Sequence, residues 1–166
     1  MKLSGRTAVA LGIGIACVGV ARGALTVKKG TLVTIPATIE LKAPPSKVWS
    51  VITSLDGFAA LTGFKTTGAA TFRKIGDSAP ATAWEDKGRL VVTELVAEKE
   101  LRVSFEPAQG HYLCQKRILL TPSAGGTRLE YWDRYTDDQP NAEQTARQVA
   151  AETEKSIDAF RRMVEK

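Results

Sequence analysis

The chain has few of the residues on which metal sites and disulfide frameworks depend. Its 166 residues include two cysteines and one histidine. Cys17 lies in an apolar N-terminal run and Cys114 in a predicted strand, and no Cys/His spacing typical of zinc sites occurs. His111 beside Gly110 is typical of a turn at the start of a strand. We therefore expect no metal, no cofactor and no disulfide framework.

Motifs for nucleophilic catalysis and phosphate binding are also missing. No serine stands in the context of a nucleophile elbow, and Gly125-Gly126 is typical of a hairpin turn. A basic surplus on the folded part is lacking as well. Five of the 23 basic residues precede residue 31, and the other 18 equal the 18 acidic residues. This balance argues against binding to nucleic acid, which needs a cationic face.

The longest apolar run lies at the N-terminus. Lys2 and Arg6 precede about 15 apolar or small residues, 7–21, a pattern typical of a secretory signal cleaved after Ala21 or Gly23. The run is short for a membrane span of about 20 residues, but residues 24–25 could extend it into an uncleaved anchor. We interpret residues 1–30 as a signal or membrane anchor and residues 31–166 as one domain. The protein is then exported or membrane-anchored.

The pattern in the rest of the chain predicts a series of strands, two short helical segments after the first strand, and one long C-terminal helix. Alternation of apolar and polar residues predicts strands over 37–41, 67–74, 81–86, 89–97, 101–105, 111–120 and 127–135. Short polar links between neighbours favour antiparallel hairpins in chain order. Pro45 suits the first turn of a helix over 47–53, and a second helical turn over 55–61, interrupted by Gly57, ends at Gly63.

The C-terminal segment has the pattern of a helix with one apolar face. Asn141 followed by Gln144 resembles a capping box. Apolar or small residues then recur every three or four positions, at Ala142, Ala146, Val149, Ala150, Thr153, Ile157, Phe160 and Val164. Because a meander of strands twists and curls, its concave face must be covered. The sequence therefore predicts an α+β fold in which six to seven antiparallel strands curve around this helix.

Three segments resemble one known superfamily. Residues 37–49 combine a first strand, Pro44-Pro45 and the pair Val48-Trp49 in the register of the START/Bet v 1/polyketide-cyclase (SRPBCC) superfamily. Residues 56–58 and 94–101 resemble its segment after the first helix and its hairpin before the fifth strand. The resemblance covers about residues 34–166 and implies a helix-grip fold. The superfamily includes lipid carriers, hormone receptors, cyclases and chaperone activators, so the resemblance implies no single activity.

Side-chain sizes along the C-terminal helix predict a hollow. Small residues occupy the first half of its apolar face, from Ala142 to Thr153, and bulky ones occupy the second half. We expect a mostly apolar pocket under the first half, although the alanines could instead permit close contact between helix and sheet. The candidate ligand-binding residues are Trp84, Val103, Phe105, Tyr112, Cys114, Tyr131, Asp133, Tyr135, Ala146, Ala150 and Thr153.

Three functions fit this pattern. The leading hypothesis is a protein that is not an enzyme and that binds or carries a small hydrophobic molecule, such as a lipid or polyketide, with its N-terminal segment at the membrane. The second is a cyclase or dehydratase in which Asp133 or Glu94 acts with Tyr131 or Tyr135, since a carboxylate in an apolar hollow can act as an acid or base. Asp133 could instead pair with a cation at the rim. The third is a protein-interaction module whose pocket is filled.

Overall fold

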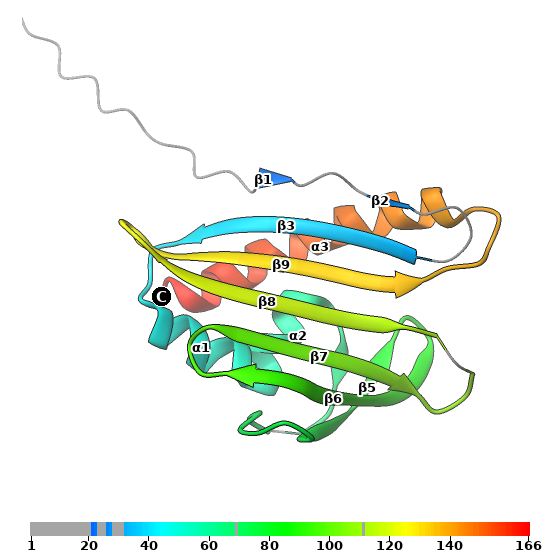
Figure 1. The fold of residues 1–166 in the computed structure, drawn as a ribbon, viewed down its shortest axis with the longest axis horizontal. Coiled ribbons are helices and arrows are strands. Elements are labelled where there is room, and N and C mark those ends of the chain that lie inside the picture. The colour runs from blue at the N-terminus through cyan, green and yellow to red at the C-terminus, as the bar shows by residue number, and fades with distance from the viewer. Residues whose placement is uncertain (1–20, 23–25, 28–31, 69, 111) are drawn as a thin grey trace, which may run out of the picture.

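The part of the chain that the structure describes forms one curled antiparallel sheet with three helices (Figure 1). The computed structural model describes residues 21–22, 26–27, 32–68, 70–110 and 112–166. Within them the strands are β1 (Ala21–Arg22), β2 (Thr26–Val27), β3 (Leu32–Leu41), β4 (Lys65–Thr66), β5 (Ser78–Ala83), β6 (Asp86–Val96), β7 (Glu100–Pro107), β8 (Cys114–Ser123) and β9 (Gly126–Thr136). The helices are α1 (Pro45–Thr53), α2 (Leu55–Thr62) and α3 (Ala142–Val164).

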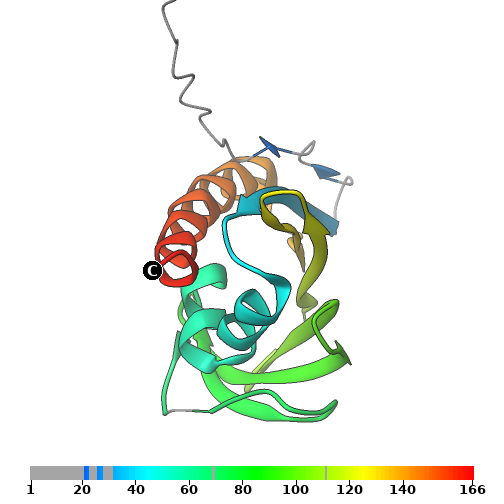
Figure 2. The same ribbon diagram turned by 90° about the vertical axis from the view of Figure 1, so that its left-hand side faces the viewer.

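The strand order confirms the predicted α+β helix-grip architecture. Strands β5 to β9 follow one another as antiparallel neighbours, and β3 pairs along its whole length with the last strand, β9. Among the six longer strands, the first and the last in chain order, β3 and β9, are therefore neighbours in the sheet. Figure 2 shows the sheet curving around α1 and α2, with α3 lying across the same concave side.

The N-terminal segment adds two short strands to the edge of this sheet. Strands β1 and β2 both pair antiparallel with β3, at Ala21 opposite Thr38 and at Thr26 opposite Thr34. The predicted signal or anchor lies mostly outside the described residues, so its prediction stands untested. No helix in the described part of the chain is both long enough and apolar enough to cross a membrane.

The predicted strand over 67–74 is wrong, because its backbone donors have other acceptors. Strand β4 covers only Lys65–Thr66. The Asp77 carboxylate accepts hydrogen bonds from the N–H groups of Arg73 (2.6 Å) and Lys74 (3.0 Å), and the Phe72 N–H donates to the Thr53 carbonyl (2.8 Å). These bonds tie the segment to its own turn and to the end of α1, which leaves no ladder of donors for a neighbouring strand.

The next hairpin turns earlier than the sequence predicts. Trp84 and Glu85 form the turn, with Ala83 opposite Asp86, whereas the sequence places the turn at residues 87–88. Trp84 has the left-handed value φ = 52°. Gly88 instead lies within β6, where an added Cβ would come within 2.2 Å of the Glu106 carbonyl oxygen. The lack of a side chain at Gly88 therefore allows β6 and β7 to approach closely, and this glycine is not part of the turn.

Helix α3 begins at the predicted place without the predicted cap. The Asn141 side chain makes no capping hydrogen bond, and its backbone carbonyl accepts from the Thr145 N–H at 3.0 Å. The apolar face is confirmed, because its buried residues are Ala146, Thr153, Ile157, Phe160 and Val164. The helix is therefore held by the burial of this face rather than by a capping box.

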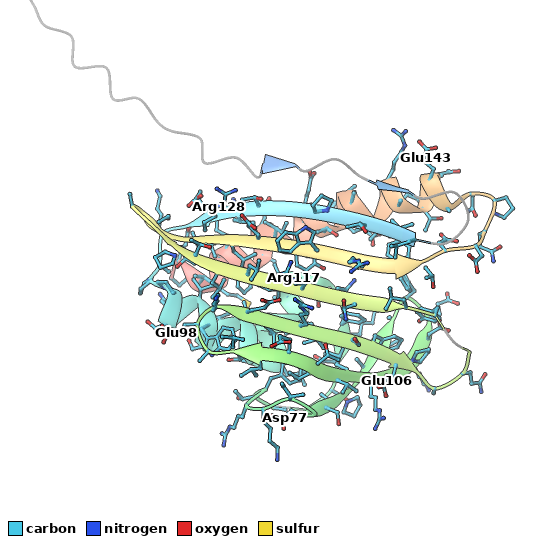
Figure 3. The ribbon with its side chains drawn as sticks, in the orientation of Figure 1. Asp77, Glu98, Glu106, Arg117, Arg128 and Glu143 are labelled. Atoms are coloured by element: carbon cyan, nitrogen blue, oxygen red, sulfur yellow. The ribbon has the colours of Figure 1, made fainter. Side chains whose placement is uncertain are left out.

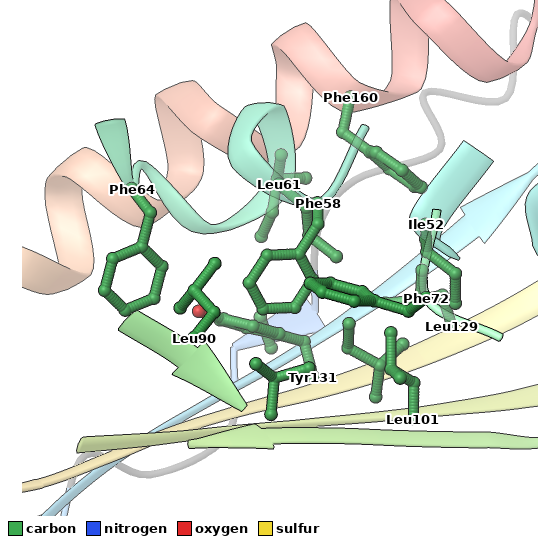
Figure 4. Close-up of a cluster of buried hydrophobic side chains, with 14 of the residues drawn as sticks. Ile52, Phe58, Leu61, Phe64, Phe72, Leu90, Leu101, Leu129, Tyr131 and Phe160 are labelled. Atoms are coloured by element: carbon green, nitrogen blue, oxygen red, sulfur yellow. The ribbon is translucent and has the colours of Figure 1, made fainter. Parts of the chain in front are cut away.

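A cluster of large buried side chains lies between the sheet, α1 and α2 (Figure 4). Phe58 of α2 contacts the Phe72 ring edge-on at a centroid separation of 5.6 Å and stacks on Phe64 at 6.3 Å. Phe160 of α3 and Tyr131 of β9 are fully buried in the same cluster. Large side chains therefore fill the space beneath α1, α2 and the last turns of α3.

The outer face of the sheet is covered by paired charges, including Glu106, Arg117 and Arg128 (Figure 3). The Glu100 carboxylate accepts hydrogen bonds from the Nε atoms of Arg117 (2.8 Å) and Arg102 (2.7 Å). The hydrogen bond from Arg117 and then that from Arg102 lower the pKa of Glu100 below its ordinary value of 4.5, although burial partly opposes them.

A carboxylate with a lowered pKa makes stability depend on acid. Because the folded pKa of Glu100 lies below the unfolded one, its contribution is complete above pH 4.5 and disappears as the pH falls through the folded value. Denaturant unfolding between pH 7 and pH 3 should therefore show a shallower loss of stability in Glu100→Gln than in the unmodified protein. Parallel curves for the two proteins would contradict this expectation.

Candidate ligand-binding cavity

A cavity of about 360 Å³ lies beneath the middle of α3. The inner face of β8 and β9 forms its floor, the link from α2 to β4 and the turn after β5 form its sides, and α3 covers it. Its lining residues are Thr62, Gly63, Phe64, Lys65, Thr82, Ala83, Trp84, Cys114, Lys116, Asp133, Val149, Glu152, Thr153 and Ser156.

Two opposite charges are buried on the floor of the cavity. Lys116 of β8 and Asp133 of β9 are directly opposite in the antiparallel register and form an ion pair. Only 4% of Lys116 and 2% of Asp133 is exposed. Alternation along both strands turns these positions inward together with Cys114 and Tyr131, so the pair is fixed by strand register and not by flexible loops.

The Lys116 ammonium retains unused donor capacity. It lies 5.1 Å from the centroid of the Phe64 ring, and its ion-pair partner is Asp133. An ammonium carries three N–H donors, and a buried donor without an acceptor is costly. Among the described residues no hydrogen bond accepts the remaining donors. The floor of the cavity therefore offers hydrogen-bond donors to a molecule that enters it.

Two tyrosines flank Asp133 on the same face of β9. The hydroxyl groups of Tyr131 and Tyr135 are buried and have no hydrogen-bond partner in the described part of the protein. Burial first, and then the nearby Asp133 carboxylate, raise the pKa of both phenols above the ordinary value of 10. Both therefore remain protonated donors at neutral pH. Neither belongs to the lining of the cavity, and Tyr135 packs behind Trp84 at a centroid separation of 5.6 Å.

Trp84 and Tyr112 form an aromatic wall beside the cavity. Trp84 is 48% exposed and lies 6.3 Å from the Tyr112 ring, whose hydroxyl donates to the Asp86 carboxylate at 2.9 Å. Tyr112 and Phe105 line a wider, open depression together with Leu113.

Burial raises the pKa of the Cys114 thiol to about 11. This cysteine therefore stays protonated at neutral pH and forms an apolar part of the cavity wall.

The structure brings together only part of the predicted binding site. Trp84, Cys114, Asp133 and Thr153 line the cavity, whereas Phe105 and Tyr112 line the open depression. Five others lie outside its lining, namely Val103, Tyr131, Tyr135, Ala146 and Ala150. The hollow starts at Val149 and reaches Ser156, so it overlaps the end of the predicted half of α3 but does not extend under the first turns, where Ala146 is completely buried. The prediction of a mostly apolar pocket is wrong, because Lys116, Asp133 and Glu152 and several threonines are part of the lining.

Glu94 does not join Asp133. The register between β6 and β7 shifts between Val92 and Glu94, which places Glu94 opposite Arg102. Residues opposite each other share a face of the sheet, and Arg102 bonds with Glu100 among the outer charges, so Glu94 belongs to the outer face. The prediction that Glu94 could replace Asp133 as the acid or base in the hollow is therefore wrong, because a bulge reverses the parity of its strand.

Ten lining residues are absent from the predicted binding site, and Lys116 and Phe64 are the two that form the charged floor of the cavity with Asp133. Lys116 interrupts the apolar face of a predicted strand, and a charge at an inward position directly across from Asp133 is a usable signal for an ion pair. Phe64 follows the left-handed Gly63 (φ = 76°) in the link after α2. A residue in such a link has no periodicity, so no sequence signal could place its ring beneath the ammonium.

Comparison with known proteins agrees with this architecture. The family described as polyketide cyclase / dehydrase and lipid transport matches residues 33–165. The chain belongs to this family. Membership in the polyketide cyclase / dehydrase and lipid transport family confirms the SRPBCC resemblance, and with it a fold that binds ligands. A comparison with curated proteins finds no match.

Solved structures share the fold at low sequence identity. Protein CV1439 from Chromobacterium violaceum is 18% identical, with a TM-score of 0.59 over 80% of this chain and 97% of its own. The Aha1 dimer from Colwellia psychrerythraea is 14% identical, with a TM-score of 0.60 over 80% and 96%. DynU16, a protein in the dynemicin biosynthetic locus, is 19% identical, with a TM-score of 0.59 over 80% of this chain and 47% of DynU16.

Proposed function

We propose that this protein binds a small, mostly apolar molecule in the cavity beneath α3 and orients it through Lys116 and Asp133. The observation that carries the proposal is a buried ion pair that lines the cavity and whose ammonium has unused donors. Small-molecule sites use a few polar groups to orient the ligand. Here the apolar side of the lining consists of Phe64, Ala83, Trp84, Cys114 and Val149, and most of the other lining residues are polar. The family description and the position of DynU16 in a biosynthetic locus support a small organic ligand.

Cavity size and charge restrict the ligand. The volume of about 360 Å³ lies near the lower end of the range for small-molecule sites, which favours one or two fused rings over a lipid with two acyl chains. The charged lining residues are two cations, Lys65 and Lys116, and two anions, Asp133 and Glu152. Because these charges balance, we expect an uncharged ligand that carries a hydrogen-bond acceptor.

The alternatives have weaker support. A cyclase or dehydratase would have to use Asp133 without Glu94, and both neighbouring tyrosine hydroxyls lie outside the cavity lining. An interaction module requires a filled interior, which the cavity argues against.

The apolar run over residues 7–21 still favours action at or beyond a membrane. The mass of the mature protein from its own cells would test that expectation.

Calorimetric titration with 2-naphthalenemethanol tests the proposal directly. The probe is uncharged, has two fused rings and carries one hydroxyl, so it matches the expected ligand class. Saturable binding with one site per chain is expected. Native mass spectrometry of the purified protein provides a second measurement, because a retained ligand would add mass. An absence of binding to this probe and to other small apolar molecules would exclude the proposal.

A larger side chain that projects from α3 into the cavity should weaken ligand binding. Thr153 is 8% exposed and lines the cavity, so the ring in Thr153→Phe would occupy the space of the ligand. We expect the affinity for 2-naphthalenemethanol to fall by about tenfold or more, equivalent to at least about 1.4 kcal/mol. Ala151→Phe is the matched control, because position 151 is exposed on the same helix. Equal affinities for the two variants would show that the ligand binds elsewhere.

A further inference from the structure

We propose that Lys116 can hold its ligand covalently, as an iminium formed with an aldehyde or ketone, with Asp133 as the counter-ion. The inference rests on the proposed function, since the ligand must first enter the cavity. It names a more specific chemical class than an uncharged apolar molecule, namely a carbonyl compound.

The position of Lys116 separates it from the other lysines. Every other lysine whose surroundings the structure describes is exposed, including Lys65, which lies in the lining of the same cavity. Lys116 is buried against Asp133 and the Phe64 ring. A carbonyl compound bound on the cavity floor would be held next to this amine, and such proximity raises the effective concentration of the reacting group.

Asp133 is placed to exchange the proton that the reaction requires. The ammonium first gives a proton to the Asp133 carboxylate, which leaves a neutral amine and a carboxylic acid. The amine nitrogen attacks the carbonyl carbon, and a proton moves from nitrogen to oxygen to give a carbinolamine. The Asp133 acid then protonates the departing hydroxyl, water leaves, and an iminium faces the restored carboxylate. One ammonium and one carbonyl thus become one iminium and one water.

Charge conservation favours this chemistry at a buried position. The chain carries one cation at position 116 before the reaction and one after it, and Asp133 neutralises both. Breaking a buried ion pair is costly because it leaves one charge unpaired. Iminium formation avoids that cost, and the Phe64 ring remains available to contact the new cation. Loss of water into bulk solvent is compatible with a cavity whose mouth is partly open beside the exposed Lys65.

Reductive trapping tests the inference. The full chain is incubated with 2-naphthaldehyde and cyanoborohydride, which reduces an iminium to a stable secondary amine, and peptide mapping then gives the modified fraction of each lysine. We expect modification of Lys116 to exceed that of Lys65 by about tenfold or more. Lys116→Arg keeps the cation but has no amine, so it should lose the dominant adduct. Lys99→Arg, at an exposed lysine outside the cavity lining, should retain it.

Two results would overturn the inference. One is uniform modification of the lysines, and the other is a dominant adduct at a lysine other than Lys116 that survives unchanged in Lys116→Arg. Titration with 2-naphthalenemethanol, which has the same rings but no carbonyl, separates the two proposals. If the alcohol binds and Lys116 is not modified by the aldehyde, the iminium inference fails and the proposed function stands. If the alcohol does not bind either, both fail.

Discussion

Lys116→Met is expected to lower the free energy of unfolding by about 3–5 kcal/mol, because it leaves the Asp133 carboxylate buried without its counter-ion. Only 2% of Asp133 is exposed, and the register of β8 and β9 fixes its short side chain on the floor of the cavity. Urea unfolding at pH 7 measures the change. A loss below about 1 kcal/mol, typical of an exposed ion pair, would contradict the burial described for this site.

The double variant Lys116→Met/Asp133→Leu completes the test. Replacement of both charges by apolar groups of similar size removes the uncompensated ion, so we expect most of the lost stability to return. The difference between the double variant and the summed single variants gives the coupling between the two residues. Recovery of stability together with loss of binding to 2-naphthalenemethanol would assign the ion pair to ligand binding and not to the stability of the fold.

Gly57→Ala is expected to destabilise the protein by about 3 kcal/mol or more, because the added methyl group has no space. A Cβ atom at this position would lie 2.0 Å from the Val51 carbonyl oxygen and 2.7 Å from Val51 Cγ1. Ser54 holds the same junction between α1 and α2, since its hydroxyl donates to the Val51 carbonyl (2.7 Å) and accepts from the Gly57 N–H (3.1 Å). Relief of the clash would have to move backbone on both helices.

Gly125→Ala provides the matched control for this prediction. An added Cβ at Gly125 meets no atom within 4 Å, and the residue lies in the turn between β8 and β9. Thermal unfolding should therefore distinguish the two variants, with a large decrease in melting temperature for Gly57→Ala and little change for Gly125→Ala. Similar small decreases for both would show that the junction between α1 and α2 can separate without cost.

Local patterns predicted the parts of the fold that depend on periodicity. The three-to-four spacing in residues 142–164 predicted the buried face of α3, and alternation in β9 predicted that Leu129, Tyr131, Asp133 and Tyr135 share one face, which the structure buries. Both periods follow from backbone geometry within one element. Gly57 shows the limit of such reasoning. Its low helix propensity predicts an interruption, whereas it lies inside α2 because only glycine permits the close approach of α1.

The sequence by itself determined the α+β class, the long terminal helix and the placement of Tyr131, Asp133 and Tyr135 on one face of a strand, because each depends on the spacing of neighbouring residues. Only the tertiary structure decided that Asp133 meets Lys116, that Phe64 lies beside their ion pair, and that Glu94 belongs to the outer face. Those outcomes depend on the register between strands, on the path of a link without periodicity and on a bulge. Each of them is fixed by contacts between segments far apart in the chain.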